Sequence, residues 1–260
     1  IQTSETGMRH RTAERVARQT GYPVISVSQS MRIISLYVDG KRHVLEPSES
    51  ILASANQALS ALERYKARLD QTSAGLDSLE IEDLVTVRDV TAVLQLMEMV
   101  RRISADIDSY VLELGTDGRL LALQVEELTR GLLAEHGFLL EDYLPEGLDT
   151  ATVDARLKWV GSPALLDLAM VARSMGLGGI DGQDLDAQVS PRGLRILSKI
   201  PRLPVVTARA VVEQWGSLQG VLGATIEELE AVDGVGAQRA RTLRDGLSRL
   251  AEISVVERYS

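Results

Sequence analysis

The spacing of apolar positions in the first 45 residues predicts one helix followed by three strands. Residues 12–19 carry apolar positions at helical spacing. Residues 23–28 and 31–38 are short β-branched runs, which are typical of strands. An Asp-Gly pair at residues 39–40 is a strong hairpin signal, and residues 41–45 form the returning strand. Such a unit is too small to stand alone, so we expect its sheet to need further strands ahead of it.

Beyond Pro47 the apolar spacing becomes helical. Ser48 is a suitable N-cap. The stripe that follows it consists of Ile51, Leu52, Ala55, Leu59, Leu62, Tyr65 and Leu69. A second stripe predicts a helix over residues 89–114, and shorter helices are expected around 119–135, 151–158 and 163–175. The glycine-rich residues 176–182 lack the Lys-Ser/Thr of a phosphate loop, so we interpret them as a connection between helical modules.

These patterns predict a mainly α fold with a small α/β remnant at the N-terminus. We expect three domains. Residues 1–46 form a partial mixed-sheet domain, residues 47–189 a helical bundle that acts as a spine, and residues 190–260 a pair of helical hairpins. The 260 residues are 45% hydrophobic, which is enough apolar surface for a core in a chain of more than one domain.

Composition excludes several classes of site. The chain has no cysteine, which rules out disulfides and thiolate metal sites and fits a reducing compartment. Its three histidines are far apart in sequence, which argues against a zinc site. No apolar run approaches the roughly 20 residues that cross a bilayer, and the first residues form no signal peptide. We expect a cytoplasmic protein, with association with the nucleoid as one option.

Charge is distributed unevenly along the chain. Residues 1–45 carry seven basic and three acidic side chains, residues 46–185 carry 11 and 25, and residues 186–260 carry ten and nine. An acidic middle between two more basic ends argues against a protein that coats nucleic acid along its whole length. Any contact with DNA is therefore expected at an end of the chain.

Residues 194–260 contain two imperfect copies of one helix–turn–helix pattern. In the second copy, glycines at 234 and 236 allow a sharp turn, and the amides that follow open a helix whose N-terminus can bind phosphate. This resembles the helix-hairpin-helix motif, which contacts the DNA backbone without reading bases. In the first copy, residues 200–210, prolines replace the glycines. The expected DNA contacts are Gly234, Val235, Gly236, Gln238, Arg239 and Arg241. The alternative is a module that serves only for packing or protein–protein contact.

The most unusual stretch lies near the N-terminus, where Arg9 and Arg11 flank His10. The planar fork of arginine suits phosphate oxygens, and several nearby hydroxyl groups add donors. Taken alone, such a basic turn is weak evidence for a phosphate site. A solvated surface or a salt-bridge cluster between subunits explains it equally well.

In its context, the run resembles a known family. The motif Gly-x-Arg-His-Arg-Thr-Ala-x-Arg at residues 7–15, the strand ending in Ser28 and the strand over residues 33–37 are similar to the second half of a diadenylate cyclase domain. With the helical middle and the paired hairpins, the order of parts resembles the DisA-type diadenylate cyclases, the DNA-integrity scanning proteins. The resemblance covers essentially the whole chain.

The resemblance implies a reaction in which two ATP molecules condense to cyclic di-AMP and release two pyrophosphates. It implies that Arg9, His10 and Arg11 act on the phosphates as catalytic residues. The implied ATP-binding residues are Thr6, Gly7, Met8, Arg9, His10, Arg11, Thr12 and Ser28. It further implies Mg²⁺ or Mn²⁺, regulation by branched or damaged DNA, and a homo-oligomer that is an octamer in the family.

Two departures from the family pattern limit this expectation. Met8 stands where some members have Thr, and the metal-carrying Asp-Gly-Ala motif is absent from the sequence. We therefore expect an N-terminally truncated chain, with no metal ligand of its own and no cyclase activity alone. The alternative is a non-enzymatic DNA-binding or scaffold module, in which Arg9-His10-Arg11 is a surface or assembly patch.

Overall fold

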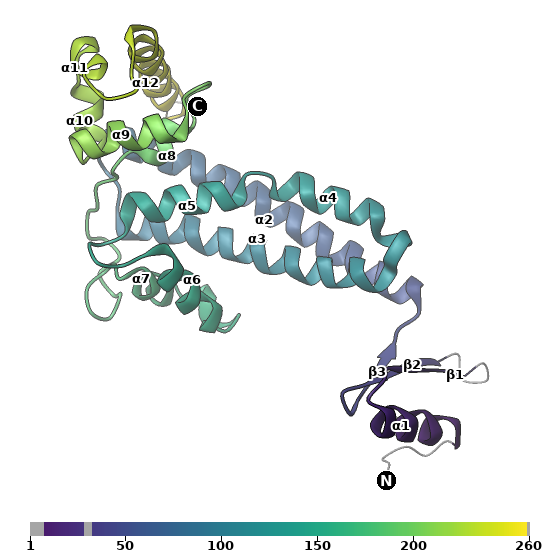
Figure 1. The fold of residues 1–260 in the computed structure, drawn as a ribbon. Helices are drawn as coiled ribbons and strands as arrows, with labels where there is room; N and C mark the ends of the chain where they lie inside the picture. The colour runs from purple at the N-terminus through teal and green to yellow at the C-terminus, as the bar shows by residue number, and fades with distance from the viewer. Residues whose placement is uncertain (1–7, 29–32, 259–260) are drawn as a thin grey trace. The chain divides into compact units, whose positions relative to one another are not determined.

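The computed structural model describes residues 8–28 and 33–258 (Figure 1). Contacts within the chain divide it into two compact units. One unit contains residues 1–61 and 104–126, and the other contains residues 62–103 and 127–260. The fold is mainly helical with one small sheet, which confirms the predicted fold class. The three-domain division stays a prediction. None of the described helices is long and apolar enough to cross a membrane.

The N-terminal elements are α1 (Met8–Thr20) and a three-stranded antiparallel sheet in the order β1-β2-β3. The strands are β1 (Val24–Ser28), β2 (Ile33–Val38) and β3 (Lys41–Leu45). Ser26 pairs with Ser35, and Ser35 pairs with Val44. Asp39 and Gly40 both adopt positive φ angles, 50° and 72°, as the predicted tight hairpin requires.

The two faces of this sheet have opposite character. Tyr37 packs with Ala13 and Ala17 of α1, and Ser26, Ser28 and Ser35 are buried at alternate positions of the same two strands. The alternate positions carry exposed apolar side chains, namely Ile25, Val27 and Ile34. The helix therefore covers a face that carries hydroxyl groups, and the aliphatic face is open among the described residues.

The central part of the chain is helical, as predicted, but the bounds of its helices differ from the predicted ones. They are α2 (Ser48–Glu82), α3 (Val87–Leu114), α4 (Arg119–Thr129), α5 (Leu132–Tyr143), α6 (Thr150–Trp159) and α7 (Leu168–Met175). Short 3₁₀ turns occupy residues 115–118 and 164–166. The predicted single helix over 119–135 was wrong. Gly131 adopts a φ of 81° and divides that segment into α4 and α5.

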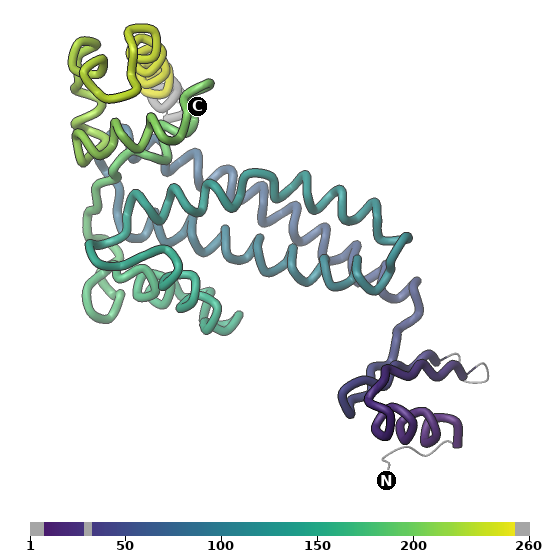
Figure 2. The backbone as a smooth tube through the Cα atoms, in the orientation of Figure 1, coloured from purple at the N-terminus to yellow at the C-terminus, as the bar shows by residue number. Residues whose placement is uncertain are grey.

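Residues 62–82 of α2 and 87–103 of α3 run antiparallel beside α5, as Figure 2 shows. Their contact faces are apolar and largely buried, for example at Leu76, Leu94 and Leu139. The glycine-rich residues 176–182 connect α7 to the following segment, as predicted, and place four glycines at positive φ. The chain then pairs with the start of α3 through a bridge between Thr86 and Gln188.

The C-terminal helices are α8 (Leu194–Ser198), α9 (Val205–Trp215), α10 (Leu218–Gly223), α11 (Ile226–Glu230) and α12 (Ala237–Arg258). They share one apolar core, in which Leu197, Val211, Leu218, Leu229 and Leu243 are fully or almost fully buried. Each of the two sequence copies thus contributes a pair of helices to a single packed module.

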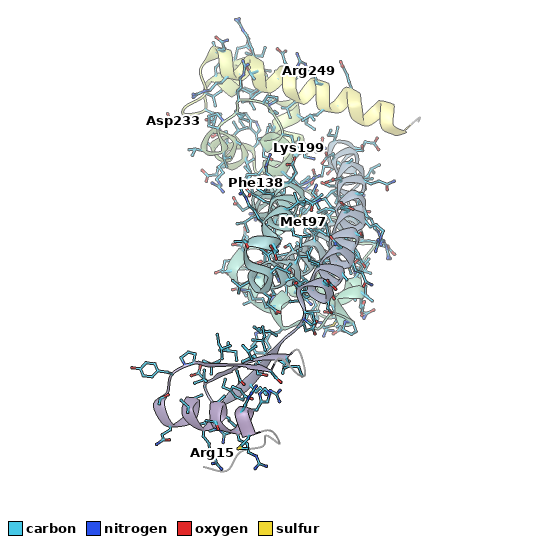
Figure 3. All side chains as sticks on the ribbon, turned by 90° about the vertical axis from the view of Figure 1, so that its right-hand side faces the viewer. Arg15, Met97, Phe138, Lys199, Asp233 and Arg249 are labelled. Atoms are coloured by element: carbon cyan, nitrogen blue, oxygen red, sulfur yellow. The ribbon has the colours of Figure 1, made fainter. Side chains whose placement is uncertain are left out.

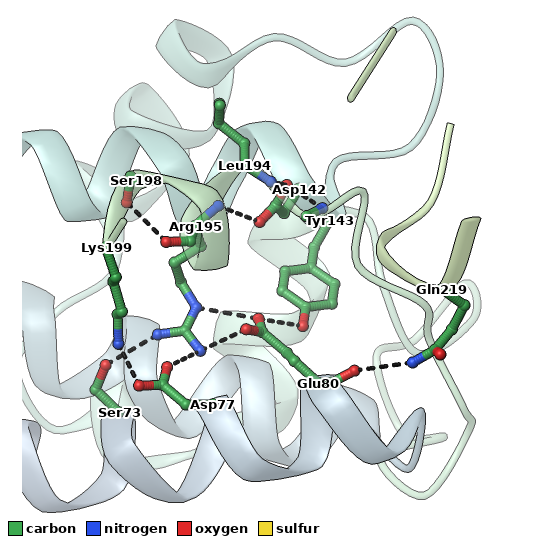
Figure 4. A network of polar contacts seen from close by, with 11 residues as sticks. Ser73, Asp77, Glu80, Asp142, Tyr143, Leu194, Arg195, Ser198, Lys199 and Gln219 are labelled. Atoms are coloured by element: carbon green, nitrogen blue, oxygen red, sulfur yellow. Dashed lines mark hydrogen bonds and ion pairs between the residues drawn. The ribbon is translucent and has the colours of Figure 1, made fainter. Parts of the chain in front are cut away.

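A buried polar network fastens this module to the helical bundle (Figure 4). Arg195 of α8 is 2% exposed, and its guanidinium donates to both oxygens of Glu80 of α2 at 3.0 and 2.6 Å. The same guanidinium donates to Ser73 at 3.1 Å, and Tyr143 donates to Glu80 at 2.7 Å. A charge this deeply buried needs such partners, since its desolvation is costly.

Asp142 completes the junction from α5. Its carboxylate accepts the backbone N–H groups of Gly193, Leu194 and Arg195 at 2.7 to 2.9 Å, and so caps α8. Burial raises the pKa of Asp142 to about 7, in spite of these three donors. The orientation of the hairpin module on α2 and α5 therefore depends on side chains far apart in sequence.

Candidate functional site

The Arg-His-Arg run lies in the first turn of α1, which begins at Met8. The sequence predicted that a helix would follow the run, so this expectation was wrong by about one turn. Successive residues of a helix are about 100° apart, and the run is accordingly divided. Arg9 and Arg11 are exposed, whereas His10 is only 4% exposed. Thr6 and Gly7 lie outside the described residues.

His10 is held from one side of its ring. Its Nδ1 lies 3.0 Å from the hydroxyl oxygen of Tyr37 on β2, and the two rings are 6.4 Å apart between centroids. Its Nε2 is buried and has no hydrogen-bond partner among the described residues. Glu14, one turn further along α1, is also buried and forms an ion pair with Arg18 at 2.7 Å through one oxygen. Within the part of the chain that the structure describes, its other oxygen has no hydrogen-bond partner.

The other residues predicted to bind ATP have contrasting surroundings. Met8 is 86% exposed, so its side chain has no fixed contact to offer. The hydroxyl of Thr12 donates to the carbonyl of Met8 at 2.9 Å, and in that rotamer it can only accept from a ligand. Ser28 ends β1 and is buried on the face of the sheet that α1 covers. The contacts of Thr12 and Ser28 with a nucleotide stay predictions.

The described residues do not fit a divalent metal site at this position. Mg²⁺ and Mn²⁺ prefer several oxygen ligands, above all carboxylates. The only carboxylate seen on this part of α1 is Glu14, which is already paired with Arg18. Across residues 8–28 and 33–258, no group of three histidine, aspartate or glutamate side chains could hold a metal ion.

The second C-terminal hairpin contains a tight turn between α11 and α12. Gly234 adopts a φ of 78°, and Gly236 stands immediately before α12 without a positive φ. Val235 is buried in the core of the module, so only its backbone is free to contact a ligand. The side chain of Arg239 donates to the carbonyl of Gly234 at 2.6 Å and thereby braces the turn. Arg241, like the predicted Gln238, is exposed on α12.

Arg244 has a structural part in this module. Its guanidinium donates to the carbonyls of Leu222 and Ala224 at 2.8 and 3.3 Å. Both carbonyls lie at the C-terminal end of α10. Cations stabilise that end of a helix. The local sequence pattern did not predict this inward contact of Arg244.

The first hairpin repeats the turn of the second. Arg202 aligns with Gly234 and adopts a φ of 65°, a conformation that few residues other than glycine adopt. The prolines on either side obscured this equivalence in the sequence. A groove of about 480 Å³ lies between this turn and α12, and Arg202, Arg239 and Arg249 line it together with Asp245. Figure 3 labels Arg249 on α12 and Asp233 at the second turn.

Known proteins match this chain over its whole length. The family described as the DisA bacterial checkpoint controller nucleotide-binding region matches residues 1–42, and the DisA linker region matches residues 45–183. The DNA integrity scanning protein DisA of Acidothermus cellulolyticus is 57% identical over 264 residues, which cover all of this chain and 71% of the relative. The chain belongs to the DisA family. The DisA proteins of Streptomyces coelicolor and a Parafrankia strain are each 56% identical and are covered to 70% and 73%.

The two family matches divide most of the chain into a nucleotide-binding region and a linker region. The nucleotide-binding match contains α1, β1, β2 and the first two residues of β3, and therefore the exposed Arg9 and Arg11 and the buried His10. The linker match contains α2 to α7. The sequence missed Tyr37 as a partner of His10. An aromatic hydroxyl on the same face of β2 as Ser35 is the signal that could have indicated it.

Proposed function

We propose that this chain is part of a diadenylate cyclase, which condenses two ATP molecules into cyclic di-AMP and two pyrophosphates. The observation that carries the proposal is the first turn of α1. There, within the nucleotide-binding match, two exposed arginines flank a buried histidine whose Nε2 has no partner among the described residues. This arrangement suits a ligand that carries several phosphate oxygens.

Each group of this turn has a distinct part in the proposed site. Arg9 and Arg11 hold phosphate oxygens and offset the negative charge that grows when the 3′-hydroxyl of one ATP attacks the α-phosphorus of the other. The N-terminus of α1 adds partial positive charge in the same place through its helix dipole. His10 fixes the orientation of the phosphates from the side of the sheet.

The proposed reaction would also need a divalent cation, Mg²⁺ or Mn²⁺, which would supply charge neutralisation at the phosphates. The described residues do not provide its ligands, and the sequence contains no Asp-Gly-Ala motif. We therefore propose that these 260 residues bind ATP but do not form cyclic di-AMP by themselves. Octameric assembly and association with the nucleoid stay predictions.

The test of this proposal is an assay for product with the purified 260-residue chain. The chain is incubated with ATP and Mn²⁺, and nucleotides are separated by chromatography. A full-length DisA relative serves as the positive control. We expect cyclic di-AMP from the control and none from the chain. Cyclic di-AMP formed by the chain alone would refute the proposal that essential catalytic residues lie outside these 260 residues.

We further propose that the C-terminal module binds branched or damaged DNA through its backbone. Both hairpin turns adopt the same left-handed conformation, and the groove beside them has three arginines against one aspartate. Contacts of this kind are positional, so we expect strong dependence on salt and little dependence on sequence. Arg202 joins the predicted contacts, because it occupies the position in the first turn that Gly234 holds in the second.

Gly236 offers a sharp test of this interface. A Cβ added there meets no heavy atom within 4 Å, and its φ is not positive, so Gly236→Ala leaves the fold intact. A phosphate that approaches the start of α12 would nevertheless meet the new methyl group. We expect Gly236→Ala to weaken binding to a four-way DNA junction several-fold, as measured by fluorescence anisotropy at moderate salt. Unchanged affinity would count against phosphate binding at this turn.

A further inference from the structure

A pocket outside both proposed sites lies in the helical bundle. Its volume is about 250 Å³, and side chains of α3, α5 and α6 line it. These parts of the three helices belong to one compact unit and consist of described residues. The buried Met97 and the side chains of Leu132 and Leu133 form its apolar part, and Leu133 is 84% exposed. A pocket below the roughly 300–1,000 Å³ of drug-sized ligands suits a small molecule with an apolar body.

The acidic group that α3 contributes to the pocket is already neutralised. Glu98 is 3% exposed, and its two oxygens accept hydrogen bonds at 2.6 Å from Arg101 and Arg102. Burial by itself would raise the pKa of Glu98, but the two guanidinium groups hold that pKa below its usual value. One carboxylate thus faces two guanidinium groups, which leaves positive charge in excess beside the pocket.

The wall formed by α6 adds an ammonium group. Lys158 is exposed and forms neither a hydrogen bond nor an ion pair with any residue that the structure describes. Asp154, one turn earlier on α6, faces His136 instead, with 3.6 Å between Oδ1 and Nε2. Water satisfies an exposed ammonium, so Lys158 alone specifies no ligand. The histidine beside it decides the character of the pocket.

His136 of α5 is an imidazole that lines the pocket with only 14% of its side chain exposed. Burial lowers its pKa, although the charges of Asp154 and Glu98 act in the opposite direction. The charged groups that share the pocket with it are Glu98 and Arg101 from α3 and Asp154 and Lys158 from α6. The ring is therefore neutral at pH 7, and a further negative charge beside it would favour its protonated form. Titratable groups with such a shift, lining a pocket, mark candidate binding sites.

We propose that this pocket binds a small organic anion, a carboxylate with an apolar body, and that binding draws a proton onto His136. The carboxylate of the ligand lies between His136 and Lys158, and its apolar body lies against Met97 and the two leucines. A protonated imidazole donates from both nitrogens, so it serves Asp154 and the ligand together. The proton comes from solvent, and no bond within the ligand changes. The site does not depend on the proposed ATP and DNA sites.

The test uses nuclear magnetic resonance of the 260-residue chain labelled with ¹⁵N in its histidines, with hexanoate as the probe. The chain has only three histidines, His10, His43 and His136, and His136→Gln identifies the third by the loss of its signals. We expect hexanoate to shift and saturate the His136 signals and to leave those of the exposed His43 unchanged. Saturating hexanoate should also raise the pKa of His136, because the protonated form binds the anion about tenfold more tightly than the neutral form.

Two further probes and two variants isolate the charge. Hexanamide has the same size without a charge, and hexylammonium reverses the charge, so both should bind about tenfold more weakly than hexanoate at pH 6.5. Lys158→Met removes the ammonium and keeps an unbranched side chain. It should weaken hexanoate binding several-fold and leave hexanamide binding unchanged. The matched control Lys41→Met, which removes an exposed ammonium from β3, should change neither.

Each part of the proposal has its own contrary result. His136 signals that do not respond to hexanoate would overturn the site. Equal binding of hexanoate and hexanamide, or tighter binding of hexylammonium, would overturn the choice of an anion. A saturating shift with an unchanged pKa of His136 would overturn the link to protonation. Equal losses of hexanoate and hexanamide binding in Lys158→Met would overturn the ion pair with that lysine, and far-ultraviolet circular dichroism checks that the variants stay folded.

Discussion

The buried ion pair between Arg195 and Glu80 should be a major determinant of stability, and Arg195→Met tests this. The substitution keeps an unbranched side chain but removes the charge. It deletes both hydrogen bonds to Glu80, the one to Ser73 and the ion pair with Asp77 at 2.5 Å. Glu80, which is 0% exposed, keeps the hydrogen bond from Tyr143 but loses its counter-charge.

The expected cost is about 3–5 kcal/mol of unfolding free energy, because removing one partner leaves a buried charge uncompensated. Replacing both partners, as in Arg195→Met with Glu80→Leu, should cost distinctly less, since apolar residues of similar volume often replace such a pair without loss. Arg209 and Glu141 provide a matched surface pair at 2.8 Å, with side chains 47% and 36% exposed. Arg209→Ala should cost no more than about 1 kcal/mol.

Urea unfolding followed by circular dichroism and by tryptophan fluorescence measures these costs. Trp215 packs against the C-terminal core, whereas Trp159 is 90% exposed, so the fluorescence change reports mainly on the hairpin module. The reasoning is refuted if Arg195→Met costs no more than Arg209→Ala. It is also refuted if the double variant is no more stable than the single one.

Three further predictions concern stability. The pKa of Asp142 is raised to about 7, so the folded chain binds this proton more tightly than the unfolded chain does, and stability should fall as pH rises from about 4 to 7. Asp142→Asn should flatten the slope of the urea unfolding midpoint against pH. An equal slope in the variant and the wild-type chain would contradict this prediction. Gly234→Ala should cost about 1–2 kcal/mol, because φ is 78°, whereas Gly236→Ala should be near neutral in the same melts. Gly182→Ala should lower the melting temperature, since its Cβ would lie 2.4 Å from the carbonyl oxygen of Ala169.

Local sequence signals predicted most of the fold. The Asp-Gly pair at residues 39–40 specified the hairpin because both residues tolerate positive φ. The apolar stripe from Val90 to Leu114 predicted α3 almost to its observed bounds. The stripe after Ser48 predicted α2, although the helix continues 13 residues beyond Leu69 to Glu82. Periodicity worked here because each of these elements buries one face against the rest of its unit.

The contacts that orient the sites could not be predicted in the same way. Arg195 and Glu80 are 115 residues apart, and Tyr143 is 63 residues from Glu80, so no local pattern connects them. The helical geometry of α1 separates His10 from its neighbouring arginines and places it against Tyr37 of β2, 27 residues away. The motif indicated the chemistry of the site, and tertiary contacts decide which atoms face a ligand.

The most direct test of the proposed ATP site is an equilibrium titration of the 260-residue chain with ATP. The variant Arg9→Ala/Arg11→Ala is compared with Lys41→Ala, which removes an exposed charge from the β2–β3 hairpin. Two lost charge-assisted hydrogen bonds should raise Kd by about two orders of magnitude, while Lys41→Ala should change it little. An equal Kd for the wild-type chain and the double variant would contradict the account.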